Sequence, residues 1–354
     1  MPRNSIFPLA LLALAVVVAS GCDRAPVLQF QPSEQVQKLK PELQTQIRET
    51  LEKYCGTPDR PKLLGNDKIS VTHLLHGRDV FMKRCVQCHG VTGDGEGPAA
   101  KWLYPRPRDY RRGKFKFTST PFDYRPRRAD LVRTLQTGVP GTSMPAFNLV
   151  PAKDIDAVVD YVLVLTHRGE IEFQLASEAE GADQLEADTV TDVIALVLDQ
   201  WKDADANAVH QLTPQPVFTA EHVVAGKKAF LTKGCSKCHG EDGRGQTPGN
   251  LRGDLKDAWG HATKAADLTS GLLHGGHLPD DVYRRIFIGI SGTPMPSFKS
   301  SLAAEPETFW NLVAYVLYVS NRRRVGEIPE AGLMVTPAAS ETAPTSEEKK
   351  EDGG

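Results

Sequence analysis

The sequence predicts an all-α protein in which one helical unit occurs twice. The prediction depends on recurring sequence blocks and on the helical spacing of apolar residues. Three blocks recur in the same order about 150 residues apart, namely Cys-x-x-Cys-His-Gly (from Cys85 and Cys235), Gly-Thr-x-Met-Pro-x-Phe (from Gly141 and Gly292) and Tyr-Val-Leu (from Tyr161 and Tyr315). Such a repeat indicates a duplication, so both copies should adopt the same fold.

The apolar pattern predicts helices at both ends of each unit. A helix is expected before each Cys motif, marked by Gly77 and Phe81 in one unit and by Gly226 and Phe230 in the other. After each Met-Pro block, apolar residues recur at i, i+3, i+4, i+7 and i+8 and so share one helix face. These residues are Ile155, Val158, Val159, Val162 and Leu163, and Phe309, Leu312, Val313, Val316 and Leu317. We therefore expect a first unit at 70–168 and a second unit at 219–324.

Three further segments lie outside the two units. Residues 22–69 are expected to be an N-terminal helical segment, with a helix over 34–54 that carries Leu43, Ile47 and Leu51 on one face. Residues 169–218 are expected to form an acidic linker with an amphipathic helix. The apolar face of that helix consists of Val190, Val193, Ile194, Val197, Leu198 and Trp201. Residues 325–354 are rich in Pro, Ala, Glu, Ser, Thr and Lys, and this composition predicts a disordered tail.

The N-terminus predicts export. Residues 1–21 have a basic start at Arg3, an apolar run over 6–18 and small residues up to Gly21, as a secretory signal peptide does. Cys22 follows the small residues directly, which resembles a bacterial lipoprotein processing site with lipid attached to Cys22. An ordinary cleaved signal peptide is the alternative. We expect a lipid-anchored protein on the periplasmic side of a bacterial membrane, or otherwise a periplasmic or secreted one.

The two Cys motifs predict two covalently attached haem c groups. In Cys-x-x-Cys-His, the thiols can each form a thioether to a porphyrin vinyl group and the adjacent His can bind the iron. The candidate residues are Cys85, Cys88 and His89 in the first unit, and Cys235, Cys238 and His239 in the second. A structural zinc site would need a second ligand pair nearby, and a redox dithiol would need a βαβ setting. Neither accompanies these motifs.

The two Met-Pro blocks predict the second axial ligand of each iron. Met144 and Met295 hold matched positions, and the Pro that follows each favours an extended backbone that can project the Met from a loop. A sulfur ligand opposite His raises the reduction potential and suits electron transfer. The alternative is that both Met side chains fill gaps in the core.

Both units resemble class I cytochrome c domains, and the resemblance covers about 205 of the 354 residues. In the first unit, Gly-Asp-Gly-Glu-Gly-Pro-Ala-Ala at 93–100 and Pro-Arg-Pro-Arg-Asp-Tyr at 105–110 are similar to a subgroup of bacterial respiratory cytochromes. The resemblance implies axial ligation by His89 with Met144 and by His239 with Met295. It also implies partners among respiratory redox proteins, such as a terminal oxidase or a quinol-oxidising complex.

The leading functional prediction is a non-enzymatic electron-transfer protein of a respiratory chain, or a cytochrome subunit of an oxidoreductase complex. A dihaem peroxidase or another haem oxidoreductase is the alternative. A dihaem peroxidase uses a releasable His after the first motif, whereas no His occurs between His89 and His167. In the second unit, His261, His274 and His277 remain alternative ligands. Redox sensing would need a signalling domain, and the sequence has no recognisable one.

Charge is unevenly distributed along the chain. The net charge is −2, which gives no indication of nucleic-acid binding. Residues 101–133 carry eleven Lys and Arg against three acids, and residues 169–205 carry eleven acids against one Lys. The basic stretch could dock an acidic partner, or its Arg residues could pair with haem carboxylates and with the acidic segment.

Cys55 lies outside both haem motifs. Three roles are open for it: a buried free thiol, a partner of Cys22, or a haem ligand.

Overall fold

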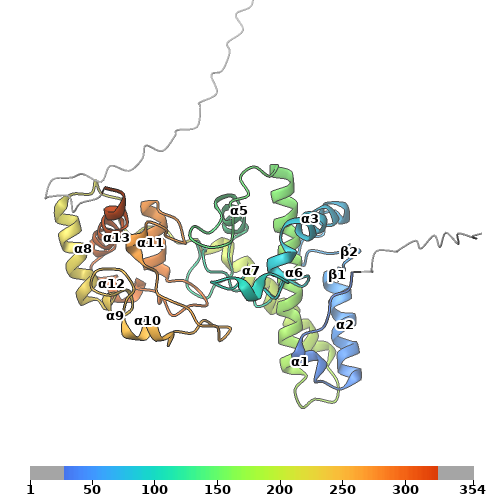
Figure 1. Cartoon of the computed structure of the whole chain (residues 1–354). Helices are drawn as coiled ribbons and strands as arrows, with labels where there is room; N and C mark the ends of the chain where they lie inside the picture. The colour runs from blue at the N-terminus through green and yellow to red at the C-terminus, as the bar shows by residue number, and fades with distance from the viewer. Residues whose placement is uncertain (1–27, 326–354) are drawn as a thin grey trace, which may run out of the picture.

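The computed structural model describes residues 28–325 (Figure 1). The predicted signal peptide 1–21, Cys22 and the predicted tail therefore lie outside the described residues, apart from Val325, which ends the last helix. The described part is all-α, as predicted, with one antiparallel pair of two-residue strands, β1 (Gly56–Thr57) and β2 (Arg60–Pro61). No helix in residues 28–325 is long and apolar enough to cross a bilayer.

The helices follow the repeat. Up to the second unit they are α1 (Glu34–Gln37), α2 (Pro41–Cys55), α3 (Val71–Arg84), α4 (Val86–His89), η1 (Ala100–Trp102), α5 (Arg128–Thr137), α6 (Ala152–Glu178) and α7 (Ala187–Ala206). The second unit contains α8 (Ala220–Thr232), α9 (Ser236–His239), α10 (Pro248–Arg252), η2 (Leu268–Ser270), α11 (Pro279–Ile288), α12 (Lys299–Leu302) and α13 (Glu307–Val325). In Figure 1 the second unit, in yellow to red, lies beside the first.

In the first unit, α3 crosses α6 at a glycine. Gly77 lies so close to the backbone of Ala157 that an added Cβ would collide with the carbonyl oxygen of Ala157. One turn further along α3, the rings of Phe81 and Tyr161 pack with their centroids 5.7 Å apart. Gly77 and Phe81, which mark this helix in the sequence, are therefore the residues that bring it against α6.

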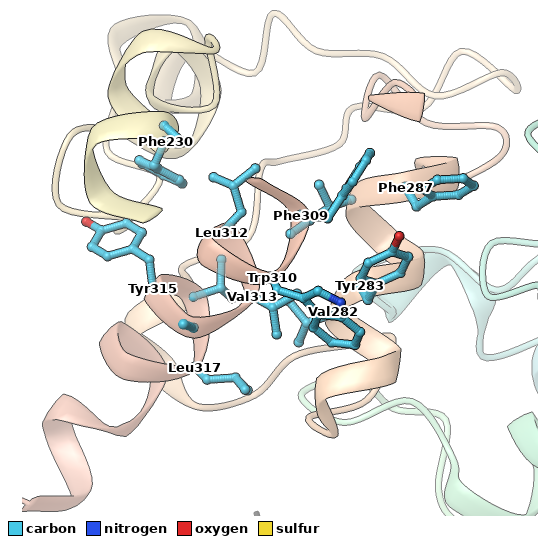
Figure 2. Packing of buried hydrophobic residues seen from close by; sticks show 14 of the residues in the cluster. Phe230, Val282, Tyr283, Phe287, Phe309, Trp310, Leu312, Val313, Tyr315 and Leu317 are labelled. Atoms are coloured by element: carbon cyan, nitrogen blue, oxygen red, sulfur yellow. The ribbon is translucent and has the colours of Figure 1, made fainter. Parts of the chain in front are cut away.

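The second unit repeats this crossing with α8 and α13. An added Cβ on Gly226 would collide with the carbonyl oxygen of Asn311, and the rings of Phe230 and Tyr315 lie 5.1 Å apart. Figure 2 shows Phe230 facing α13, while Tyr283 of α11 packs against the other side of α13 near Trp310. The matched crossings mean that the two units share one core plan.

The acidic segment 169–218 contains the predicted amphipathic helix as α7, and this helix packs against other helices. α6 continues past residue 168 to Glu178, so the expected unit boundary falls inside a helix. The C-terminal half of α6, together with α1, α2 and α7, forms what we call the accessory helical unit. Its core consists of Val36, Leu43, Ile47, Leu51, Cys55, Leu64, Ile171, Leu175, Ala176, Ala179, Leu185, Val193, Ile194 and Val197. The apolar stripe predicted on α7 buries itself here, although its segment is strongly acidic.

The helix expected over 34–54 is interrupted. The chain forms α1 and then α2, with Lys40 in extended backbone between them. Pro41 explains the break, because a proline disfavours helical backbone in the residue before it. The predicted apolar face, Leu43 and the residues one and two turns later, is buried in the accessory helical unit.

Ion pairs join α6 and α7 to the basic stretch. The Glu170 carboxylate accepts a hydrogen bond from the Trp201 indole at 2.8 Å and forms an ion pair with Arg125 at 2.5 Å. Arg127 lies 3.6 Å from Asp205. Both arginines therefore pair with the acidic segment, which favours the second of the two interpretations of the basic stretch for these residues.

His167 lies in the middle of α6 and has no polar partner. Its side chain is buried, both of its ring nitrogens lack a hydrogen bond, and its ring meets Trp201 edge-on at 4.7 Å. Burial, assisted by the nearby Arg125 charge, lowers the pKa of His167 to about 3. His167 is therefore neutral in the folded protein at pH values where it would be charged in the unfolded chain.

We expect Gly226→Ala to destabilise the second unit by about 1–3 kcal/mol, because the new methyl group must push α8 away from the α13 backbone. Chemical denaturation followed by far-UV circular dichroism measures this loss. Gly249→Ala is a matched control, since its Cβ would meet only Asp254 at an ordinary 3.5 Å. Equal stability of the two variants would contradict the close crossing.

We expect His167→Phe to make folding less sensitive to acid. The folded-state pKa of His167 is lowered, so its contribution is fully present above the unfolded-state pKa and is lost as pH falls toward the folded-state value. Each pH unit in that window costs the parent about 1.4 kcal/mol at most. The difference in unfolding free energy between variant and parent should therefore rise from pH 7 to pH 4. A difference that does not change with pH would contradict the prediction.

Candidate functional site

Each Cys-x-x-Cys-His motif forms one helical turn. The turn is α4 in the first unit and α9 in the second, and it begins at the first Cys of the motif. The carbonyl of Cys85 accepts the His89 N–H at 2.9 Å, and the carbonyl of Cys235 accepts the His239 N–H at 3.0 Å. This turn sets the three side chains of each motif around the same cavity.

A glycine-rich loop follows each turn and orients the imidazole. Gly95 N–H donates to the His89 carbonyl at 3.0 Å, and Gly245 N–H donates to the His239 carbonyl at 2.7 Å. Gly93 has φ +77°, and an added Cβ there would lie 2.6 Å from the Tyr110 ring. The loop therefore brings the segment before Tyr110 over the imidazole.

The imidazoles are held through Nδ1. His89 Nδ1 lies 3.2 Å from the Arg108 carbonyl, and His239 Nδ1 lies 3.0 Å from the Ala266 carbonyl. A carbonyl can only accept, so Nδ1 carries the proton and Nε2 is left free to bind a metal. Burial lowers the pKa of both histidines, which keeps them in the neutral form that binds metals.

The thiols do not resemble a zinc site. Burial raises the pKa of Cys85 to about 12 and that of Cys235 to about 11, which disfavours a charged thiolate at either position. A zinc ligand must be a thiolate, whereas a thioether carries no charge and can be buried without cost from desolvation of an ion. Within residues 28–325, no group of three or more His, Cys, Asp or Glu side chains could hold a bare metal ion.

The two Met loops have the same hydrogen bonds. In the first unit, Val139 N–H donates to the Met144 carbonyl at 3.0 Å, and Thr142 Oγ1 accepts the Met144 N–H at 3.1 Å. The equivalent bonds in the second unit, from Ile290 to the Met295 carbonyl and from Met295 to Thr293, are 3.1 and 3.2 Å long. The backbone on either side of each Met is thus closed into a tight loop that presents the Met to the cavity.

Each unit encloses a cavity between its Cys-His turn and its Met loop. The first has a volume of about 570 Å³ and is lined by Cys85, Cys88, His89 and Met144. The second has a volume of about 400 Å³ and is lined by Cys235, Cys238, His239 and Met295. The structure therefore brings together all eight of the cofactor-binding residues predicted from the sequence, four to a cavity. Both volumes lie in the range of about 300–1,000 Å³ typical of cofactor sites.

The donor set and the walls fit a haem group. Besides the thiols, imidazole and thioether, the first cavity has mainly apolar walls, including Leu131, Leu135 and Val159. Arg106, Arg108 and Lys116 add positive charge to the first cavity, and Lys116, Lys264 and Arg285 add it to the second. An apolar slot with cationic groups at its rim suits a porphyrin that carries two carboxylates.

Three residues that line both cavities were not predicted as site residues. Lys116 and Phe117 of the first unit and His274 of the second unit line both cavities. Lys116 was visible only as one charge of the basic stretch. His274 was expected at most to be an alternative ligand in its own unit, and nothing local in the sequence indicates that it also reaches the first cavity.

Other candidates lie away from the cavities. Cys55 is a free, fully buried thiol in the accessory helical unit, and burial raises its pKa to about 12. Neither cavity is lined by Cys55, His261 or His277. This position agrees with the first of the three roles left open for Cys55, and its proposed partner Cys22 lies outside the described residues.

Comparison with known proteins agrees with this geometry. The family model for cytochrome c matches residues 75–166 and 223–320. Among solved structures, one chain of the Kuenenia stuttgartiensis reducing HAO-like protein complex Kustc0457/Kustc0458 is similar, with 31% identity and a TM-score of 0.53. The alignment covers 69% of this chain and 95% of that chain. The search of curated proteins found no match.

The two matched regions coincide with the two cavities and together span more than half of the chain. Cytochrome c domains bind covalently attached haem c and transfer electrons through it. The chain belongs to the cytochrome c family.

Proposed function

We propose that the protein is a dihaem electron carrier that acts outside the cytoplasm in a respiratory chain, either alone or as the cytochrome subunit of a redox complex. One observation carries the proposal: each cavity has its own Cys pair, His and Met, so the chain can hold two haem groups with both axial positions of each iron filled. When bound, haem supplies a one-electron Fe(III)/Fe(II) couple. With no open position at the iron, only electrons can pass.

The residues around each cavity act by position and charge. The carbonyls of Arg108 and Ala266 hold His89 and His239 in the tautomer that leaves Nε2 free for the metal. The closed hydrogen bonds of the Met loops keep each thioether in place, which lowers the reorganisation that an electron transfer requires. Positive side chains at the cavity rim stabilise the reduced state over the oxidised state, which raises the reduction potential.

The proposed partners are other redox proteins of a respiratory chain, such as a terminal oxidase or a quinol-oxidising complex. Support for a redox partner comes from the similar solved chain, which belongs to a protein complex. The segment 93–110 adds support through its similarity to bacterial respiratory cytochromes. An enzymatic role, such as that of a dihaem peroxidase, would need one iron with a replaceable ligand. Two histidines line the first cavity, His89 of the Cys motif and His274 of the second unit, so the first unit supplies no second His to its own cavity.

Export and anchoring complete the proposal. Arg3, the apolar run over 6–18 and the small residues before Cys22 support a cleaved signal with lipid attached to Cys22. A single lipid-modified residue would hold the two haem domains at the periplasmic face of a membrane. An electron carrier placed there can exchange electrons with membrane-bound respiratory complexes.

We expect Met144→Ala and Met295→Ala each to open one axial position. The protein should still carry two haem groups, because the Cys pairs are intact. In each variant one haem group should lose the spectral features of Met ligation, bind added cyanide and have a lower reduction potential. Haem determination and spectro-electrochemical titration measure this. Met82→Ala is the control, since Met82 packs against the core of the first unit and not in the cavity. Unchanged spectra in both cavity variants would refute the proposed ligands.

We expect Cys22→Ser to release the protein from the membrane fraction into the soluble periplasmic fraction, because the anchor would lack its attachment atom. Cell fractionation measures the release, and mass spectrometry of the N-terminal peptide identifies the acyl groups in the parent protein. A variant that stays with the membrane, or a parent peptide without acyl groups, would contradict the anchor and leave the haem sites unaffected.

A further inference from the structure

The two cavities share one wall. Lys116 and Phe117 come from the loop before α5 of the first unit, His274 comes from the loop before α11 of the second unit, and all three line both cavities. We call these three residues the shared wall. These three residues are therefore in contact with both of the spaces that fit haem.

Arg285 of α11 locks the first unit's loop onto the second unit. Its guanidinium donates to the Lys116 carbonyl at 3.0 Å and also to the Thr118 carbonyl. It lies over the Phe117 ring, 6.0 Å from the centroid. Arg285 also lines the second cavity, so the residue that connects the two units is part of the wall of that cavity.

His274 of the second unit packs against the first unit. An added Cβ on Gly141, in the Met144 loop of the first unit, would lie 3.4 Å from His274 Nε2. Burial lowers the pKa of His274, with the nearby Lys116 charge as a second cause. The second unit thus contributes a neutral ring that packs beside the Met loop of the first.

Contacts outside the shared wall keep the two units from separating. Arg133 of α5 forms an ion pair with the buried carboxylate of Asp281 of α11. The Asp123 N–H donates to Ser291 Oγ at 3.1 Å. The Arg108 guanidinium, whose own carbonyl holds His89, stacks 3.7 Å above the Trp259 ring of the second unit. These contacts come from three separate segments of the first unit, so the relative position of the cavities is set by the fold.

We propose that the shared wall is the path by which the two haem groups of this chain exchange electrons. The inference rests on the proposed dihaem function and adds the route between its two centres. In the half-reduced protein one iron goes from Fe(II) to Fe(III) while the other goes from Fe(III) to Fe(II), and no bond forms or breaks. An electron delivered to either unit can thus leave through the other.

Lys116 gives the shared wall a measurable property. Lys116 is half-buried, lines both cavities and forms no ion pair with another residue in the described part of the chain. Burial lowers its pKa to about 8. A charge in a medium of low dielectric acts strongly on its neighbours. One positive charge next to both cavities should raise the reduction potentials of both haem groups together.

The first experiment compares three lysines. We expect Lys116→Gln to lower both reduction potentials in spectro-electrochemical titration. Lys83→Gln should lower only the first and Lys264→Gln only the second, because each of these lysines lines a single cavity. A Lys116→Gln variant in which one potential, or neither, moves would overturn the shared wall. Haem determination on each protein keeps this result separate from the dihaem function, which would fail only if fewer than two haem groups were found.

The second experiment measures the exchange itself. After a flash-generated flavin semiquinone reduces part of the protein, the relaxation of absorbance between the two haem groups reports the exchange rate. We expect Phe117→Ala to slow this step several-fold. The controls are Phe147→Ala and Phe298→Ala, which remove an aromatic ring from the first or the second cavity alone. Equal rates in all three variants and the parent would overturn the proposed path.

Discussion

The close crossing of the first and last helices of each unit is the constraint on which both sites depend. At Gly77 and Gly226 the partner helix approaches so closely that a methyl group has no room. The Cys-His turn follows directly from the first helix of the pair, and the Met loop leads directly into the last, except for the short α12 of the second unit. The crossing therefore sets the distance between the imidazole side and the thioether side of each cavity. The packing of the core consequently also determines the geometry of the cofactor site.

Charge is arranged around the cavities in two different ways. Arginines that face the accessory helical unit are neutralised by it, as Arg125 is by Glu170. By contrast, Arg108, Lys116 and Arg285 line the cavities, and burial lowers the pKa of each, to about 10, 8 and 10. A half-buried cation without a full counter-charge is unfavourable, and the carboxylates of a bound haem would supply that charge. The cofactor thus completes the electrostatics of the interior as well as its packing.

The accessory helical unit stiffens the first haem domain. Because α6 runs as one helix from the first unit into this second core, the helix that closes the first cavity is held at both of its ends. Glu172 of α6 accepts the Ser33 N–H at 2.6 Å, which ties the start of the described chain to the same helix. The contacts of Arg133, Arg285 and Arg108 connect the first unit to the second. A stiff arrangement suits electron transfer, in which the nuclei should move little.

The sequence by itself determined the all-α class, the duplication and the eight candidate haem-binding residues, four of which line each cavity, because each of these depends on local motifs and on helical spacing. The carbonyl partners of His89 and His239 depend on loops that return to the imidazole from 19 and 27 residues away, and these contacts carry no sequence pattern. The amphipathic helix of the acidic segment was predicted from its apolar stripe, but no sequence pattern indicates that this stripe packs with α1, α2 and α6 in a core of its own. The shared wall of Lys116, Phe117 and His274 was decided by the tertiary structure alone. It exists only where the two units meet, and their docking leaves no periodicity in either one.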